Sequence, residues 1–529
     1  MGKHKSRMTM APKRSAYPVV DVFAGPGGLG EGFASLRDER GKSRFRSVAS
    51  FERDEFSHQT LLLRHFFRSF PEDEVHDDYY HYLKGRIELK DLYRRHESEF
   101  SHAKKSALKV SLGPKEHASV RKLIDERLSD AGRWALVGGP PCQAYSLAGR
   151  SRMRGNPEFE QDERHFLYKE YLKILADHQP PVFVMENVKG LLSATVGSER
   201  VISRIVSDLS DPRSAIPSHA SGRGYRLYSL SESEKPGEEI DPKRFLVRSE
   251  EHGVPQARHR MFILGIRNDL RITPRRLVPQ RSPTVRQTIG NLPRIRSTIS
   301  RGMDSAERWK REIENISLMP LPAQLCDEPK AREIVRRLKR TLSHQFAWPE
   351  TSSTACYPGI ANRSNHEALT SLRDDRLSVL TGHEARGHMP SDLRRYAYAA
   401  IFAEVTGRSP KLVDFPQCLL PDHENVELGR SGKMFSDRFR VQLPDEVSTT
   451  VTSHISKDGH YFIHYDPTQC RSLTVREAAR LQTFPDNYSF QGPRTAQFHQ
   501  VGNAVPPYLA AQIAGIIADV LDSMRVEKQ

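Results

Sequence analysis

The sequence predicts an α/β fold: a doubly wound, mostly parallel sheet, accompanied by a second, smaller and irregular domain. In the first half of the chain, short apolar runs alternate with amphipathic helical stretches, which is typical of parallel sheets. Several of these runs end at glycine-rich or polar turns, where sheets of this kind collect their ligands. After Ile266 the alternation stops, and residues 270–300 are rich in proline and arginine.

The regular elements of the first half follow in chain order. The expected strands are 17–23, 46–52, 134–137, 181–186 and 261–266. The expected helices between them are 30–36, 56–67 and 165–178. Each strand is a short apolar run, and each helix places its apolar residues at helical spacing.

The second half has fewer clear elements. Residues 305–440 are irregular apart from two expected helices, 330–342 and 391–405, and the chain closes with an apolar helix at 508–524. The expected division is a basic tail (1–16), a first domain (17–275), an inserted domain (276–470) and a return segment (471–529) that completes the first domain.

Composition narrows the class of protein. The five cysteines are widely spaced and form no CxxC pair, which argues against disulfides, a structural zinc site or another metal, and favours a reducing, intracellular setting. No run of about 18 apolar residues occurs, so no membrane span is expected. A secretory signal is not expected either, because no apolar core follows the basic N-terminus.

The basic residues are unevenly distributed. The formal charge is +15, and residues 271–440 hold 29 Lys and Arg against 19 Asp and Glu. Eight arginines and no acidic residue lie between Arg271 and Arg301. A solubilising surface is one interpretation, but the concentration of arginine favours a face that contacts phosphates.

A glycine loop follows the first strand. Gly25, Gly27 and Gly30 have GxGxxG spacing, and Glu52 lies 22 positions beyond Gly30, at a distance suited to a ribose hydroxyl. Taken alone, this pattern fits a nicotinamide or flavin dinucleotide as well as S-adenosylmethionine. A tight glycine turn that binds no ligand is the alternative.

A second loop carries a thiol. Gly138-Gly139-Pro140-Pro141-Cys142-Gln143 places Cys142 just beyond a strand end, where two prolines stiffen the chain. A thiolate there is a soft nucleophile for electron-poor carbon, which a dehydrogenase does not need. A small buried cysteine is the alternative.

Two further motifs supply polar groups. Glu186 and Asn187 end an apolar strand, where a partly desolvated carboxyl can hold a proton near neutral pH or simply cap a helix. In Gln256-Ala257-Arg258-His259-Arg260, strand alternation puts Arg258 and Arg260 on one face. Their like charges destabilise that face unless anions or carboxylates pair with them. An edge strand with solvated arginines is the alternative.

These four motifs, in this order, resemble the DNA cytosine-5 methyltransferase family of bacterial restriction-modification systems. Two later segments, Arg471–Gln482 and Gln500–Pro506, resemble the family's structural motif after the recognition domain and its last motif beside the cofactor. The resemblance covers about 18–270 and 445–520. It implies a Rossmann-like S-adenosylmethionine-dependent methyltransferase, with target recognition in the inserted domain.

The resemblance also implies the roles of individual residues. In the catalytic group, Cys142 attacks cytosine C6, protonated Glu186 binds ring N3, Asn187 orients the site, and Arg258 and Arg260 hold the base and the carboxyl. The implied cofactor-binding residues are Phe23, Gly25, Gly27, Gly28, Gly30, Glu52, Asp77, Pro140, Leu167 and Asn503. Asp78 is an alternative to Asp77 for the adenine. The insert at 78–130 is interpreted as a loop over the DNA or as decoration.

The function implied is methyl transfer to C5 of a flipped-out cytosine in a specific duplex DNA sequence, through a covalent Cys142–C6 adduct. The alternatives are an RNA cytosine-5 methyltransferase and a non-catalytic DNA-binding homologue. A Cys-Phe-Thr signature typical of the RNA enzymes is absent after Val188, and both Cys142 and Glu186 are present. We expect a cytoplasmic, nucleoid-associated monomer with double-stranded DNA as partner, and a cognate restriction endonuclease that acts independently.

Overall fold

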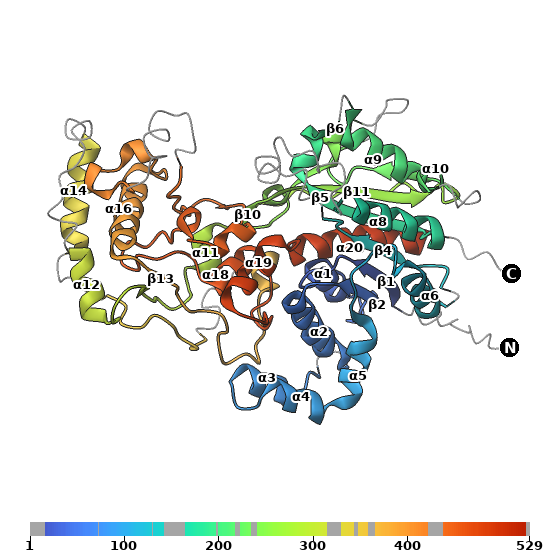
Figure 1. Cartoon of the computed structure of the whole chain (residues 1–529), viewed down its shortest axis with the longest axis horizontal. Coiled ribbons are helices and arrows are strands. Elements are labelled where there is room, and N and C mark those ends of the chain that lie inside the picture. The colour runs from blue at the N-terminus through green and yellow to red at the C-terminus, as the bar shows by residue number, and fades with distance from the viewer. Residues whose placement is uncertain are drawn as a thin grey trace, which may run out of the picture.

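The computed structural model describes the chain in eleven stretches. They are residues 16–71, 74–129, 131–141, 164–196, 199–216, 223–233, 241–314, 329–342, 348–357, 365–421 and 437–524. Cys142 lies outside these residues. Two masses are evident in Figure 1, one built on a central sheet and one around helices α12, α14 and α16.

An eight-stranded sheet forms the larger mass, with the order β3-β2-β1-β4-β5-β11-β8 and with β9 paired to β11. The strands are β1 (Tyr17–Val22), β2 (Phe45–Glu52), β3 (Ala107–Lys109), β4 (Ala135–Gly138), β5 (Val182–Val188), β8 (Tyr225–Tyr228), β9 (Leu246–Arg248) and β11 (His259–Arg267). The pairs from β3 to β5 are parallel, whereas β11 is antiparallel to its three neighbours. The predicted doubly wound, mostly parallel sheet is therefore confirmed.

The strand order reverses between β1 and β4. From β1 the chain proceeds outward to β2 and β3, then returns to place β4 on the other side of β1. The carboxyl ends of two strands that diverge in this way leave a crevice between their loops. The loops after β1 and β4 are the glycine loop and the loop that leads to Cys142, so the topology brings the first two motifs together.

Helices cover both faces of the sheet because the strand residues alternate. Val182 and Val184 of β5 pack on one face with α1 (Gly28–Ser35) and α20 (Pro507–Ser523). Phe183 and Met185 face the other side, with α6 (His117–Leu128), α8 (Arg164–His178) and α9 (Val201–Ser210). A strand segment buried on both faces must be apolar at every position, as β5 is from Val182 to Met185.

The final helix completes this core. The segment Arg494–Ser523 is long and apolar enough to cross a membrane by length and composition, but 78% of its apolar window is buried inside the protein. Its second part, α20, packs against α1 and the sheet. We therefore interpret this segment as a core element, in which the apolar character serves packing.

The interpretation of 78–130 as a loop or decoration was wrong. The segment contains α3 (Asp77–Leu83), α4 (Leu89–Arg95) and α5 (Glu97–Ser106), then edge strand β3 and helix α6. Val120 and Ile124 of α6 are buried in the main core. The short run that forms β3 is followed by charge and glycine, so its apolar signal was too weak to identify a strand. Strand β8 was missed for the same reason.

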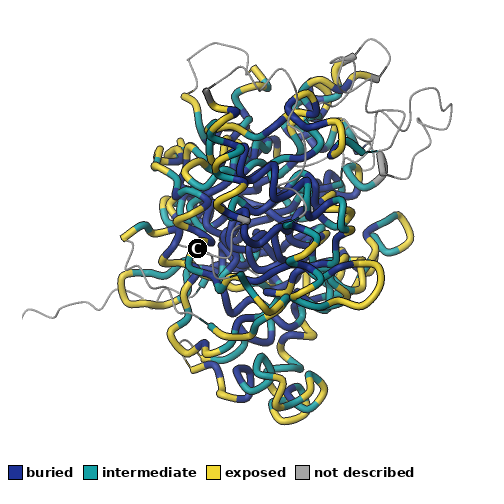
Figure 2. Tube along the Cα trace, turned by 90° about the vertical axis from the view of Figure 1, so that its left-hand side faces the viewer, coloured by how far each residue is buried: buried dark blue, intermediate teal, exposed yellow. Residues whose placement is uncertain are grey.

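The second mass has its own core. It contains α12 (Ala306–Glu314), α14 (Pro329–Leu342) and α16 (Pro390–Thr406), and the two predicted helices agree with α14 and α16. Trp309, Ile334 and Tyr396 meet in this core. Figure 2 shows buried chain running continuously through the molecule, with exposed chain at its edges. The expected helix 30–36 and the other expected strands agree with the observed elements to within three residues.

A third core joins the two masses. It packs α11 (Val285–Ile289) against α18 (Val475–Leu481) and α19 (Arg494–Asn503). Two short parallel pairs cross the same region: β10 (Gln256–Ala257) with β14 (Ser448–Thr449), and β12 (Thr298–Ile299) with β13 (Gly387–His388). The return segment thus lies between the sheet and the irregular mass (Figure 1).

Candidate functional site

The glycine loop adopts a backbone that its sequence requires. Phe23, Gly25 and Gly27 all have positive φ, at 60°, 58° and 98°. A side chain at Gly28 would meet the carbonyl oxygen of Val505 at 2.3 Å. Left-handed backbone explains the first glycines, and the close approach of the return segment explains Gly28. The expected packing of the last motif beside this loop is therefore observed.

Glu52 holds the loop at its other end. Its carboxylate accepts a hydrogen bond from the Gly25 amide at 2.8 Å, and a second oxygen accepts from the amides of Arg53 and Asp54 at 2.9 and 2.7 Å. The end of β2 and the glycine loop are thus in direct contact. The predicted contact of Glu52 with a ribose hydroxyl stays a prediction, and the structure places this carboxylate at the glycine loop.

Asp21, the penultimate residue of β1, is a buried carboxyl that no sequence pattern singled out. It is fully buried and has no side-chain hydrogen-bond partner among the described residues, and only the backbone amide of Gly30 lies close enough to offset part of the rise in its pKa. Burial and then the negative charge of Glu52 raise the pKa of Asp21 to about 8. Two carboxyls in a desolvated loop are stabilised by a cation, and S-adenosylmethionine carries positive charge on its sulfonium and ammonium groups. The donor set of the loop therefore fits this cofactor.

Glu186 lies against the loop that leads to Cys142. A Cβ at Gly139 would come within 2.7 Å of Glu186 Oε2, so any larger residue there would displace the Glu186 carboxylate. Asn187 donates a hydrogen bond from Nδ2 to the Pro140 carbonyl at 3.2 Å. The strand end of β5 thus fixes the chain two residues before Cys142.

The charge state of Glu186 is set by two opposing effects. Burial raises the pKa of Glu186 above its ordinary value, and the charges of Arg260 and Arg258 offset part of that rise. Arg260 Nε lies 3.2 Å from Glu186 Oε1, and both side chains are less than one-fifth exposed. A carboxyl in this setting can hold a proton while it stays oriented by a guanidinium.

Arg258 does not share the position of Arg260, contrary to the expectation that both would hold the base and the carboxyl. Its guanidinium donates hydrogen bonds to the carbonyls of Val451, at 2.9 Å, and Gly502, at 3.1 Å. It is 1% exposed. Arg258 therefore fastens the chain at Val451 and the return segment at Gly502 to the start of β11.

Gln256 has the same structural role. Its side chain accepts a hydrogen bond from the Val451 amide at 2.7 Å and donates to Gln482 Oε1 at 2.9 Å. Gln482 in turn donates to the carbonyls of Val501 and Ala504. A chain of buried amides thus links β10 to the last motif, which periodicity could not reveal.

The placement of Asp77 at the cofactor is contradicted by the structure. Asp77 is exposed in the first turn of α3 and pairs with Arg376 at 2.7 Å, while Asp78 faces histidines of α3–α5. Helix α3 protrudes at the lower edge of the molecule, away from the sheet (Figure 1). The strand beside β2 is β3, and the Val110 amide donates to the Glu52 carbonyl at 3.0 Å. Residues 110–112 therefore lie beside the end of β2, where Asp77 does not.

Two remaining cofactor candidates are described individually. Leu167 lies in the first turn of α8 and is half-buried. Asn503 is the last residue of α19 and is exposed, directly before the chain that packs on Gly28. The structure leaves both as candidates.

The segment Arg271–Arg301 does not form one phosphate-contacting face. Arg296 is buried and binds Asp304, while Arg275 pairs with Asp519 of α20 on the outside of the sheet. Arg286 and Arg294 pair with Asp445 and Asp466. The absence of acidic residues within the segment concealed partners that lie far away in the sequence.

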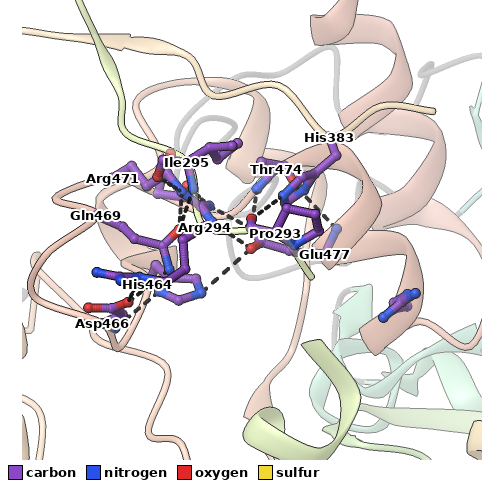
Figure 3. A network of polar contacts seen from close by, with 12 residues as sticks. Pro293, Arg294, Ile295, His383, His464, Asp466, Gln469, Arg471, Thr474 and Glu477 are labelled. Atoms are coloured by element: carbon purple, nitrogen blue, oxygen red, sulfur yellow. Dashed lines mark hydrogen bonds and ion pairs between the residues drawn. The ribbon is translucent and has the colours of Figure 1, made fainter. Parts of the chain in front are cut away.

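A buried polar network anchors the irregular mass to the return segment (Figure 3). Glu477, at the start of α18, accepts two hydrogen bonds of 2.7 Å from the Arg471 guanidinium, and both side chains are 1% exposed. His383 lies between Thr474 Oγ1, at 3.1 Å, and the Pro293 carbonyl, at 2.8 Å. The paired charge of Arg471 holds the pKa of Glu477 well below its usual range.

Comparison with known proteins identifies a family. The family model described as "C-5 cytosine-specific DNA methylase" matches residues 107–212 and 241–519. The Type II methyltransferase M.Bpa9945I of Bacillus paralicheniformis is 31% identical, and the match covers 95% of this chain and 99% of that protein. The DNA (cytosine-5-)-methyltransferase M.ApeKI of Aeropyrum pernix is 27% identical over 96% of this chain and 100% of its own. Type II methyltransferase M.DdeI of Desulfomicrobium norvegicum is 24% identical over 74% of each chain.

Proposed function

The chain belongs to the C-5 cytosine-specific DNA methylase family, and from that premise we propose that it transfers a methyl group from S-adenosylmethionine to C5 of a flipped-out cytosine in a specific duplex DNA sequence. The general activity, DNA (cytosine-5)-methyltransferase, follows from the family. The covalent mechanism, the cofactor and the site residues are our proposal. The contact of Glu186 with Arg260 and with the Gly139 backbone is the observation that carries it.

Cys142 is the proposed nucleophile. Its thiolate forms a bond to cytosine C6, the C5–C6 double bond breaks, and the electron pair makes C5 nucleophilic. Glu186, protonated, donates a hydrogen bond to ring N3, where negative charge develops. After methylation, loss of the C5 proton expels the thiolate and restores the double bond. The Asn187–Pro140 hydrogen bond positions the chain that carries the thiol.

Arg260 is the proposed ligand of the cytosine carbonyl. Its guanidinium already binds Glu186 through Nε, which leaves its terminal nitrogens to the pocket side and to the His259 carbonyl. A single guanidinium can thus orient the acid and the base together. Arg258 is a positioning residue in this proposal, because its donors are engaged by Val451 and Gly502.

The cofactor would lie in the crevice between β1 and β4. S-adenosylmethionine supplies an electrophilic methyl group when bound. Phe23, Glu52, Pro140, Leu167 and Asn503 would contact it, together with Gly25, Gly27, Gly28 and Gly30. Asp21 would contribute negative charge behind the loop once the positive charge of the bound cofactor lowers its raised pKa. Residues 110–112, at the end of β3, replace Asp77 as the candidates for the adenine edge.

We further propose that residues 276–470 recognise the DNA sequence and that the catalytic domain is formed by 17–275 with 471–529. Flipping a base costs a few kcal/mol, which contacts to phosphates and grooves can offset. The relatives are named type II methyltransferases, so we place the protein in the bacterial cytoplasm, on nucleoid DNA, acting as a monomer beside an independent restriction endonuclease.

The test combines product mapping with adduct trapping. Bisulfite sequencing of DNA from cells that express the chain should show 5-methylcytosine at one recurring sequence, and Cys142→Ser should abolish it. DNA with 5-fluorocytosine at that sequence should form a covalent complex with the wild type alone, because C5 cannot lose fluorine as it loses a proton. Methylation by Cys142→Ser, or the absence of any adduct on a methylated sequence, would refute the mechanism.

A further inference from the structure

A cluster of two histidines and an aspartate lies outside the methyl-transfer site. His76 precedes α3, Asp78 is in its first turn, and His96 joins α4 to α5. One donor atom from each lies within 4.8 Å of the others. Among the described residues, this is the only group of three or more His, Cys, Asp or Glu with such geometry.

We propose that His76, Asp78 and His96 bind a divalent transition metal, with Zn²⁺ as the best match. His96 Nε2 lies 3.2 Å and His76 Nδ1 lies 3.6 Å from Asp78 Oδ2. Ligand atoms around a tetrahedral Zn²⁺ with bonds of about 2.0–2.1 Å are roughly 3.4 Å apart. Both distances to Asp78 Oδ2 therefore match the spacing of neighbouring corners of a zinc site, and the two histidine nitrogens lie within 4.8 Å of each other. A fourth corner would be open to water.

The donor types select the class of metal. Two imidazoles and one carboxylate suit Zn²⁺ and neighbouring ions, whereas Mg²⁺ and Ca²⁺ prefer oxygen ligands only. His76 Nδ1 accepts a hydrogen bond from the Asp78 amide at 3.1 Å, so this nitrogen carries no proton and presents a lone pair. Metal binding would exchange that one hydrogen bond for a coordinate bond.

Surrounding groups orient two of the three ligands. The other carboxylate oxygen of Asp78, Oδ1, accepts from Arg95 at 3.2 Å and faces His81 Nδ1 at 3.4 Å, which leaves Oδ2 for the metal. The His96 ring packs edge-on against Phe66 and Phe70. Partners of this kind fix ligand orientation in metal sites.

The site would cross-link three short helices at the edge of the sheet domain. Helices α3, α4 and α5 have seven, seven and ten residues, and short elements gain most from a cross-link between their ends. Helix α3 also supports the segment near residue 375, since Tyr80 donates to Asp374 at 2.8 Å and Asp77 pairs with Arg376. Metal binding would therefore hold this contact in place.

The guanidinium of Arg95 gives the proposal a distinctive test. It places a positive charge on the carboxylate that would bind the metal, so Arg95→Gln should raise Zn²⁺ affinity several-fold. A cluster that merely forms ion pairs would gain no metal affinity from that change. His81→Ala should alter affinity less than the loss of a ligand does.

The experiment titrates the full-length protein, stripped with chelator, with ZnCl₂ by calorimetry, and repeats the titration with Co²⁺ by visible absorption. We expect one site in the wild type, at least a tenfold loss of affinity in His76→Ala and in His96→Ala, and no change in His102→Ala, which replaces an exposed histidine of α5 outside the cluster. Zn²⁺ should raise Tm in the wild type and in His102→Ala but not in His76→Ala.

His76 is exposed, so its substitution leaves the core intact even where His96→Ala fails to fold. Equal Zn²⁺ affinity in the wild type and His76→Ala would overturn the assignment. Unchanged or weaker binding in Arg95→Gln would overturn it as well.

Discussion

At the scale of single residues, Glu186 determines how the proposed reaction depends on pH. Burial raises the pKa of Glu186, and methyl transfer requires its protonated form. The rate should therefore fall as pH rises through that pKa. Glu186→Gln should lower single-turnover methylation by about 10²–10⁴-fold, the usual contribution of a positioned acid, and should flatten the alkaline fall. A wild-type alkaline profile in Glu186→Gln would assign the titration to another group.

Substitutions of the two arginines near Glu186 should have different effects, one on the methylation rate and its pH dependence and the other on stability. Arg260→Gln removes a charge that lowers the pKa of Glu186, so it should slow methylation and shift the alkaline fall upward with little effect on folding. Arg258→Gln leaves the buried carbonyls of Val451 and Gly502 without donors and should cost about 3 kcal/mol of stability. Thermal unfolding and single-turnover rates measure both. Equal loss of Tm in the two variants would contradict their separate roles.

Asp21 should link stability to pH. Its ordinary pKa is 3.8 and its folded pKa is about 8. Between about pH 4 and pH 8 the Asp21 carboxyl is protonated in the folded state but not in the unfolded state. The free energy of unfolding therefore falls as pH rises across this range, and the stability that protonated Asp21 contributes at about pH 4 is lost by about pH 8. Asp21→Asn cannot titrate, so the wild type should lose up to about 6 kcal/mol of stability relative to it across that range. Unfolding curves of both proteins without cofactor test this, and parallel pH profiles would contradict it.

At the scale of elements, alanine substitutions at two loop glycines should impair different properties, the methylation rate in one case and cofactor binding in the other. Gly139→Ala would force a Cβ to within 2.7 Å of Glu186 Oε2, whereas a Cβ at Gly25 meets nothing within 4 Å but must adopt φ of +58°. We expect Gly139→Ala to reduce the methylation rate at least tenfold with cofactor affinity retained. Gly25→Ala should mainly weaken cofactor binding. Isothermal titration with S-adenosylmethionine and single-turnover assays distinguish the two, and a reversed pattern would refute this division of roles.

Sequence patterns predicted the long elements and missed the short ones. Helix α8 was placed to within one residue and strand β5 to within two, because their apolar positions extend over several residues. Strand β3 has three residues, too few to show a period, and its omission misplaced the adenine contact at Asp77. The sequence placed Glu52 at the end of the second strand, and its contact with the Gly25 amide follows from the local geometry of one strand–helix–strand unit.

The sequence could not reveal which distant groups each buried polar side chain contacts. Arg258 and Arg260 lie two positions apart and looked equivalent, but one meets Glu186 and the other meets Val451 and Gly502. Which carbonyl or carboxylate a guanidinium meets depends on how distant segments cross. Asp21 shows the same limit, because its isolation is a property of the packed loop.

At the scale of the whole molecule, charge alone does not identify the DNA surface. Of the arginines between Arg271 and Arg301, four pair with acidic residues elsewhere in the fold. Burial and ion pairing thus remove half of this basic segment from any role in phosphate binding. The exposed arginines that form no ion pair with a described residue, such as Arg301 in the turn between β12 and α12, are the remaining candidates.

Salt dependence of DNA binding should therefore separate Arg301 from Arg275. Each phosphate contact contributes about 0.9 to the slope of log K against log salt concentration. Arg301→Ala should reduce that slope by up to about 0.9, because it removes an exposed charge from the proposed recognition domain. Arg275→Ala, the matched control, should leave the slope unchanged, since Arg275 pairs with Asp519 on the outside of the sheet. Fluorescence anisotropy with a duplex that carries the target sequence, measured at several salt concentrations, gives both slopes. Equal slopes for Arg301→Ala and the wild type would show that this turn does not contact DNA. A reduced slope for Arg275→Ala would instead place DNA on the side of the sheet where Arg275 pairs with Asp519.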